Sequence, residues 1–99
     1  MRALPMNQYL VLDALMHPGR ALAASQIVAA IPSLSRASAY AAITKLQADG
    51  RIGARWDTPD SGQARRMFTI TALGREAWNT ARQRLGAPLG QLASQGVTQ

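Results

Sequence analysis

The side chains with the clearest chemical potential are arginines and hydroxyl groups concentrated in the middle third of the chain. Residues 35–66 contain six of the eleven lysines and arginines, against three of the five acidic residues. A guanidinium group binds phosphate oxygens and the guanine edge through paired hydrogen bonds. Together with a net charge of +6, this clustering favours a polyanionic partner. The alternative is that the arginine and alanine content reflects only the base composition of the genome.

The sequence contains no residue set suited to catalysis. It has one histidine, no cysteine and five carboxylates, and no two carboxylates have the helical spacing that would join them for acid–base chemistry. The single lysine, Lys45, does not follow a glycine-rich phosphate loop. Asp57 and Asp60 lie in a turn and would make at most a poor surface cation site. We therefore predict that the chain is not an enzyme and has no metal or cofactor.

Length and composition predict a single folded domain. The chain has 99 residues, of which 47% are hydrophobic and 16% charged, as in globular proteins. Cysteine is absent, which is compatible with a reducing cytoplasm. No apolar run approaches the ~18–20 residues of a membrane span, and the first residues lack the pattern of a signal peptide. We expect a cytoplasmic protein that makes no membrane contact.

The first helix is expected to run from an Asn7 cap to about Met16. Apolar residues surround its whole circumference, which indicates burial on two sides, either inside the monomer or partly against a second subunit. Gly19 supplies the turn that follows. Residues 20–23 are too short for more than a bridge strand.

A helix-turn-helix is expected next. One helix spans about 24–31 and ends at Pro32, and a second spans 35–50, with Ser35 as its N-cap and Gly50 as its stop. Two helices joined by so short a turn are typical of this motif.

Two strands and a last helix complete the predicted fold. Strands at 51–56 and 65–70 flank a polar loop and form a β-hairpin. Thr71 caps a helix that extends to about residue 85. Its predicted apolar stripe contains Leu73, Ala77, Trp78, Ala81 and Leu85, and we also expect Trp56 to face the core. The fold class is therefore α+β: a winged helix-turn-helix with three helices, a two-stranded wing and a C-terminal helix.

We expect residues 1–85 to form this domain and residues 86–99 to form a tail, loosely ordered or docked at a dimer interface.

The helix over 35–50 has a core face and an opposite face of small and polar residues. A helical projection places Ala39, Ala42, Ile43 and Leu46 towards the core. The opposite face suits the major groove of DNA, because small side chains allow close approach and hydroxyl groups hydrogen-bond to base edges. The candidate DNA contacts are Ser35, Arg36, Ala37, Ser38, Tyr40, Ala41, Thr44 and Lys45 on this helix, and Arg55, Arg65 and Arg66 on the wing.

Each candidate also has an alternative role. We expect Arg36 to contact either guanine or phosphate, and Tyr40 and Lys45 to contact phosphates. The wing arginines reach the minor groove or the backbone, although Arg66 would serve equally well to brace the wing through Asp57 or Asp60. For any single residue the alternative is an ordinary solvated surface, and for Tyr40 it is also a partly buried packing residue.

Two runs of sequence resemble the PadR family of bacterial winged-helix regulators, with MarR-type winged helices as the second choice. They are Leu-Gln-Ala-Asp-Gly-Arg-Ile at 46–52 and Arg-Arg-Met-Phe-Thr-Ile-Thr-Ala-Leu-Gly-Arg-Glu-Ala at 65–77. The similarity extends from about residue 8 to 85. Two features depart from the family pattern: Ala39 replaces a usual leucine, and the last helix is short and broken at 86–88, which leaves the mode of dimerisation open.

The resemblance and the residues together imply a sequence-specific transcriptional regulator that binds double-stranded DNA. We expect a homodimeric repressor that binds an inverted repeat through the helix at 35–50 and the wing at 56–66. The alternative is a winged helix used for protein–protein contact or assembly, with no specific DNA site. A small-molecule effector is compatible with the family but has no support in the residues.

Overall fold

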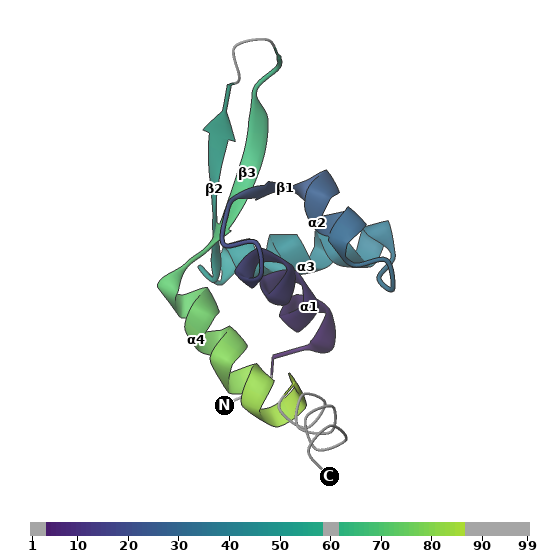
Figure 1. Ribbon diagram of the computed structural model, residues 1–99, viewed down its shortest axis with the longest axis vertical. Helices are drawn as coiled ribbons and strands as arrows, with labels where there is room; N and C mark the ends of the chain where they lie inside the picture. The colour runs from purple at the N-terminus through teal and green to yellow at the C-terminus, as the bar shows by residue number, and fades with distance from the viewer. Residues whose placement is uncertain (1–3, 59–61, 87–99) are drawn as a thin grey trace.

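The computed structural model describes residues 4–58 and 62–86. They form a winged-helix fold that consists of helices and one small sheet (Figure 1). This confirms the predicted α+β fold class. In chain order the elements are α1 (Met6–Met16), β1 (Leu22–Ala23), α2 (Ala24–Ala30), α3 (Arg36–Ala48), β2 (Ile52–Asp57), β3 (Arg65–Ile70), α4 (Ala72–Ala81) and a π-helical turn, η1 (Arg82–Gly86). None of the helices in the described ranges is both long and apolar enough to cross a bilayer.

The sheet has three strands in the order β1-β3-β2, all antiparallel. The hairpin of β2 and β3 was predicted, and the bridge strand at 20–23 becomes β1, which pairs Leu22 with Phe68. This third strand anchors the hairpin to the helix-turn-helix, because β1 leads directly into α2.

Helix α1 is the centre of the domain. Val11, Leu12 and Leu15 are almost completely buried, and α1 contacts α2, α3, α4 and β3. The apolar circumference is thus explained by contacts within the monomer, and Leu15 is not available to a second subunit. The predicted cap was wrong: α1 begins at Met6, so Asn7 lies inside its first turn and makes no capping hydrogen bond.

The hairpin leaves the helical body as it approaches its tip (Figure 1). Ile52, at the base of β2, is 2% exposed, whereas Ala54 and Trp56 on the same face are exposed. The prediction that Trp56 faces the core was therefore wrong. Side chains alternate along β2 as predicted, but the helices cover only the base of the hairpin, and 70% of Trp56 is exposed to solvent.

Helix α4 begins as predicted, with the Thr71 hydroxyl accepting a hydrogen bond from the Gly74 amide. Its α-helical part ends at Ala81, and the turn that follows is π-helical rather than α-helical. Ala81 is buried and Trp78 is half-buried, as expected, but Leu73 is 57% exposed and does not belong to the core stripe. Gly86, the first residue of the predicted tail at 86–99, ends η1, whereas the side chain of Leu85 and the rest of that tail lie outside the described part of the chain.

Candidate nucleic-acid interface

Helix α3 is held by one apolar face and two defined ends. Its four predicted core residues are all buried: Ala39, Ala42, Ile43 and Leu46. The Ser35 side chain caps the first turn by accepting a hydrogen bond of 3.1 Å from the Ser38 amide. At the other end Gly50 has a φ of 75°, a conformation that favours glycine and reverses the chain into β2.

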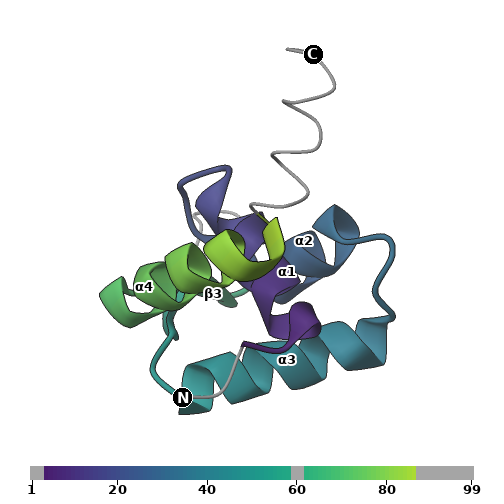
Figure 2. The same ribbon diagram turned by 90° about the horizontal axis from the view of Figure 1, so that it is seen from below.

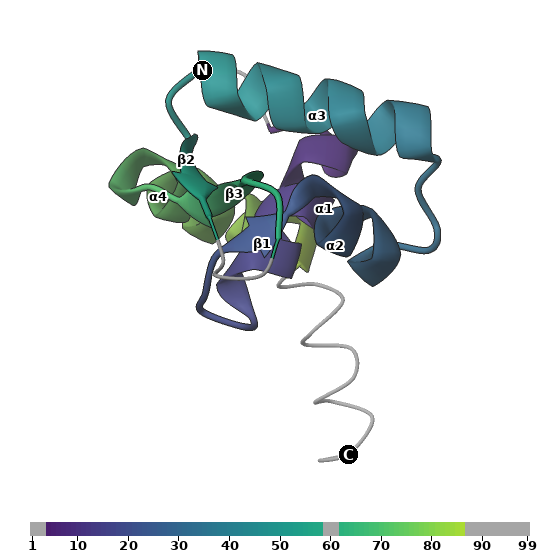
Figure 3. The same ribbon diagram turned by 90° about the horizontal axis from the view of Figure 1, so that it is seen from above.

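The opposite face of α3 is uncovered. Views from below and above show α3 along one edge of the molecule, with α1 and α2 on its inner side only (Figures 2 and 3). Ser38 is half-buried, and the other seven candidate residues on this helix and its cap are exposed: Ser35, Arg36, Ala37, Tyr40, Ala41, Thr44 and Lys45. The structure therefore brings these candidates together on one accessible surface.

Two hydroxyl groups on this face already form hydrogen bonds within α3 and its cap. Thr44 donates its hydroxyl hydrogen to the Tyr40 carbonyl at 3.0 Å, so its oxygen remains available as an acceptor. In the major groove an acceptor matches the exocyclic amino groups of adenine and cytosine. Ser35 is occupied by the cap of its own helix, which makes it a positioning residue in this geometry.

The cations at the C-terminal end of α3 form ion pairs with an aspartate. Asp49 lies 3.6 Å from the Lys45 ammonium and 3.6 Å from the Arg51 guanidinium. These pairs are weak, because the Lys45 side chain is 62% exposed and water screens the charges. Lys45 is thus accessible to a phosphate, but Asp49 competes for it.

The wing places its arginines on two faces. Opposed residues of an antiparallel pair share a face, and the register sets Trp56 opposite Arg66 and Asp57 opposite Arg65. Arg55 shares the second face with Asp57, because the two are separated by one residue of the strand. All three candidate wing arginines are exposed, and they do not form one patch.

Arg66 is held by an aromatic ring rather than by an acidic residue. Its guanidinium lies 5.7 Å from the centre of the Phe68 ring, within the range of a cation–π contact. The salt-bridge contacts found in the described residues do not include one between Arg66 and Asp57. Asp60, the other predicted brace, lies outside the described residues.

A joint between α3 and α4 was not anticipated as part of the site. The Thr71 hydroxyl donates to the Gly50 carbonyl at 2.7 Å, and the Thr71 amide donates to the Arg51 carbonyl at 3.1 Å. Gly74 lies directly against the Arg51 backbone, where a Cβ would collide with the carbonyl oxygen. The Thr-x-x-Gly spacing of residues 71–74 is the signal available in the sequence, although by itself it predicts only that Thr71 caps a helix.

A second cluster links α1 to α4. Asp13 accepts a hydrogen bond of 3.0 Å from the Trp78 indole and lies 3.2 Å from the His17 imidazole. Burial and the neighbouring Asp13 carboxylate raise the pKa of Tyr9 above its ordinary value, and Arg82 offsets part of this effect. The Arg82 guanidinium also lies 5.4 Å from the centre of the Trp78 ring. This cluster is structural in character.

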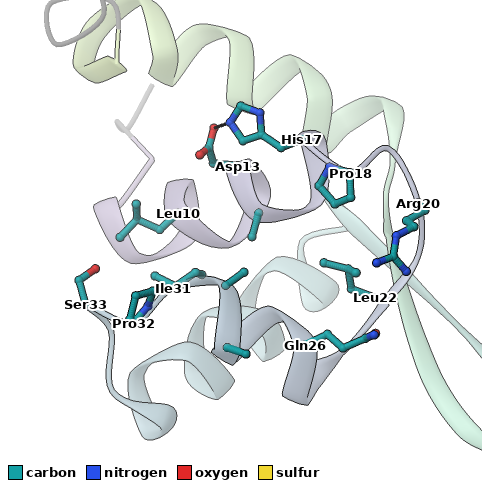
Figure 4. A pocket seen from close by; sticks show the side chains of 13 residues that line it. Leu10, Asp13, His17, Pro18, Arg20, Leu22, Gln26, Ile31, Pro32 and Ser33 are labelled. Atoms are coloured by element: carbon teal, nitrogen blue, oxygen red, sulfur yellow. Dashed lines mark ion pairs between the residues drawn. The ribbon is translucent and has the colours of Figure 1, made fainter. Parts of the chain in front are cut away.

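An open groove of about 640 Å³ lies between α1 and α2 (Figure 4). Leu10 and Ile31 form part of its apolar wall, and Arg20 lies at one end. Asp13 and His17 border it but pair with each other, so we assign no effector to the groove. In the described ranges, no three acidic or imidazole side chains are grouped closely enough to bind a metal ion.

Comparison with known proteins identifies the family. The model of the "Transcriptional regulator PadR-like family" matches residues 22–80, which include α2, α3, the wing and most of α4. No curated protein matches the chain at a significant level.

Three solved structures illustrate the similarity of fold. A PadR family regulator from Clostridium difficile has a TM-score of 0.74 and 14% identity, over 94% of this chain and 99% of that one. Bacillus subtilis PadR, solved in complex with operator DNA, has a TM-score of 0.66 and 18% identity, over 77% of this chain and 46% of that one. Bordetella bronchiseptica BpsR, whose DNA binding is described as regulated by 6-hydroxynicotinic acid, has a TM-score of 0.68 and 22% identity, over 95% of this chain and 64% of that one.

The family match covers more than half of the chain and includes both runs that suggested it. Members of this family are transcriptional regulators, in agreement with the prediction that the chain is not an enzyme. The chain belongs to the PadR-like family of transcriptional regulators.

Proposed function

We propose that this chain is a sequence-specific DNA-binding regulator that acts as a homodimeric repressor on an inverted repeat. The observation that carries the proposal is the uncovered face of α3, where Arg36, Ala37, Ala41 and Thr44 are exposed together. Small residues at two of these positions would let the helix lie deep in a major groove. The cytoplasmic location expected from the sequence is part of this proposal.

The exposed face of α3 and the wing would contribute differently to DNA binding. The described part of α3 has only two cations, Arg36 and Lys45, and Lys45 is shared with Asp49. Base edges would therefore be recognised mainly by shape, hydroxyl acceptors and Arg36. The exposed wing arginines, Arg55, Arg65 and Arg66, would contribute affinity through phosphate contacts or the minor groove.

Repression would be steric. A two-fold dimer would place two copies of α3 in successive major grooves, ~34–36 Å apart, and its half-sites would form an inverted repeat. Such a complex would exclude RNA polymerase from an overlapping promoter.

Selection of bound sites from random DNA tests the function directly. A palindromic consensus, bound with a log–log salt slope of about −0.9 for each neutralised phosphate, would support a homodimeric DNA reader. Weak, sequence-independent binding to every duplex, including the protein's own promoter region, would contradict it. That result would instead favour the alternative of a winged helix used for protein–protein contact.

Arg36→Ala separates two roles for this residue. If Arg36 contacts guanine, the consensus should lose a guanine and affinity should fall by about 1–3 kcal/mol. If it contacts phosphate, the consensus should stay intact and the salt slope should become shallower by about 0.9. Arg84→Ala is the matched control, because Arg84 is also exposed but lies in η1, away from α3.

A further inference from the structure

The exposed face of the wing carries an indole that contributes little to the domain's own core. Trp56 is 70% exposed, the largest exposed fraction among the large hydrophobic side chains of the described residues. A tryptophan left in water forgoes most of the stabilisation that its burial would give. Tryptophan is enriched at contact surfaces relative to the rest of the protein surface.

Trp56 is paired with a positioned cation. It stands directly opposite Arg66 in the hairpin register, so both side chains lie on one face. Arg66 is held in turn over the Phe68 ring at 5.7 Å. Phe68 belongs to the same strand, β3, and its ring is buried in the core, so the Arg66 guanidinium packs against the base of the wing.

The charge around the indole favours an anionic partner. Of the four charged side chains in the described part of the hairpin, residues 52–58 and 62–70, the register places Arg66 on the face of Trp56, whereas Arg55, Arg65 and Asp57 share the other face. A surface with excess positive charge and one flat apolar ring matches a sugar–phosphate backbone, in which anionic phosphates alternate with apolar deoxyribose.

We propose that Trp56 and Arg66 form a backbone clamp on DNA, in which the indole contacts deoxyribose and the guanidinium binds the adjoining phosphate. This inference rests on the proposed function and adds Trp56, which is not among the candidate DNA contacts predicted from the sequence. Deoxyribose and phosphate are the same in every nucleotide of DNA, so the clamp contributes affinity and no sequence preference.

The clamp predicts two different salt signatures. Trp56→Ala should weaken binding to every duplex by about tenfold and leave the log–log salt slope unchanged, because an indole displaces no counterion. Arg66→Ala should weaken binding and make the slope shallower by about 0.9. Met6→Ala is the matched control, because it removes another exposed hydrophobic side chain, 46% exposed on α1.

Tryptophan fluorescence gives a second readout. The wild type contains two tryptophans, Trp56 and the half-buried Trp78, whereas Trp56→Phe retains only the second. Acrylamide should quench the wild type strongly without DNA and much less with a saturating duplex. The Trp56→Phe variant should show no such protection. Circular dichroism should confirm that the Trp56 variants fold as the wild type does.

The outcomes separate the two proposals. If the wild type binds no duplex, the proposed function fails. If the wild type binds DNA but Trp56→Ala binds equally well and DNA does not protect the indole, only the clamp fails. The clamp is also overturned if Trp56→Ala changes the selected consensus, or if it changes the mass of the DNA-free protein in sedimentation, which would place the indole at a protein interface.

Discussion

The hydroxyl of Thr71 donates a 2.7 Å hydrogen bond to the carbonyl of Gly50. This bond connects the end of the proposed recognition helix to the start of α4, between residues that are 21 positions apart in the sequence and flank the whole wing. The same oxygen accepts from the Gly74 amide at 3.1 Å. One side chain therefore caps α4 and fixes its position relative to α3.

Loss of this hydroxyl should destabilise the domain. Thr71→Val keeps the shape but removes the cap and the Gly50 contact, and we expect a loss of about 2 kcal/mol in the free energy of unfolding. Urea denaturation measures the change. Thr80→Val is the matched control, because the Thr80 hydroxyl donates to the Glu76 carbonyl at an exposed position within the same helix. Equal stability of the two variants would show that the joint has no energetic role.

The close approach at Gly74 should be still more sensitive. A Cβ there would overlap the Arg51 carbonyl oxygen and lie 2.7 Å from Ile70 Cγ1, so Gly74→Ala should destabilise by about 2–3 kcal/mol despite the higher helix propensity of alanine. At Gly53 an added Cβ would lie 3.8 Å from its nearest neighbour. Gly53→Ala should consequently be neutral or stabilise by about 0.4–1 kcal/mol. Thermal unfolding in which Gly74→Ala matches the wild type would refute the steric argument.

The hydrogen bond from Trp78 to Asp13 should contribute to the packing of α4 on α1. Phenylalanine cannot donate this bond, and we expect Trp78→Phe to cost about 1–2 kcal/mol, because the partner is charged but 31% exposed. A double-mutant cycle with Asp13→Ala, which removes the acceptor oxygen, isolates the pair. Trp56→Phe, at an exposed indole, should leave stability unchanged. If the effects of the changes at Asp13 and Trp78 on the free energy of unfolding are additive, the two side chains have no interaction energy and the prediction is wrong.

Asp49 should limit DNA affinity. It pairs with both Lys45 and Arg51 at 3.6 Å, so Asp49→Asn frees two cations and removes one negative charge that would repel phosphates. Binding to DNA should tighten by about threefold to tenfold at low salt, and the gain should shrink as salt rises. Glu76→Gln, on α4, makes the same change of charge elsewhere. A comparable gain in both variants would attribute the effect to net charge alone.

Tyr9 should couple stability to alkaline pH. Burial and Asp13 raise its pKa above the ordinary 10.0, so the folded protein holds the phenol proton to a higher pH than the unfolded chain does. The stabilisation associated with the neutral phenol is present below pH 10.0 and is lost as the pH rises through the raised value. In a tyrosinate absorbance titration, Tyr9→Phe should remove a late-titrating component. Loss of an early component instead would show that the assigned direction is wrong.

Local rules placed most of the secondary structure correctly. Ser35, Thr71 and Gly50 define helix ends through bonds and dihedral angles that neighbouring residues determine, and β3 was predicted with its observed bounds. The candidate residues of α3 also followed from sequence, because a 3.6-residue period separates the face that packs from the face that does not. Their contacts with DNA stay a prediction.

Only the tertiary structure decided which alternating residues are buried. Ile52, Ala54 and Trp56 share one face of β2, yet the helices cover only the first of them. Periodicity assigns a side chain to a face of a strand, but burial depends on whether another element lies over that point of the strand. For the same reason Leu73 is exposed, because no other element covers its position on α4. The packing of the other elements likewise places α1 at the centre of the monomer and leaves Trp56 exposed on the wing.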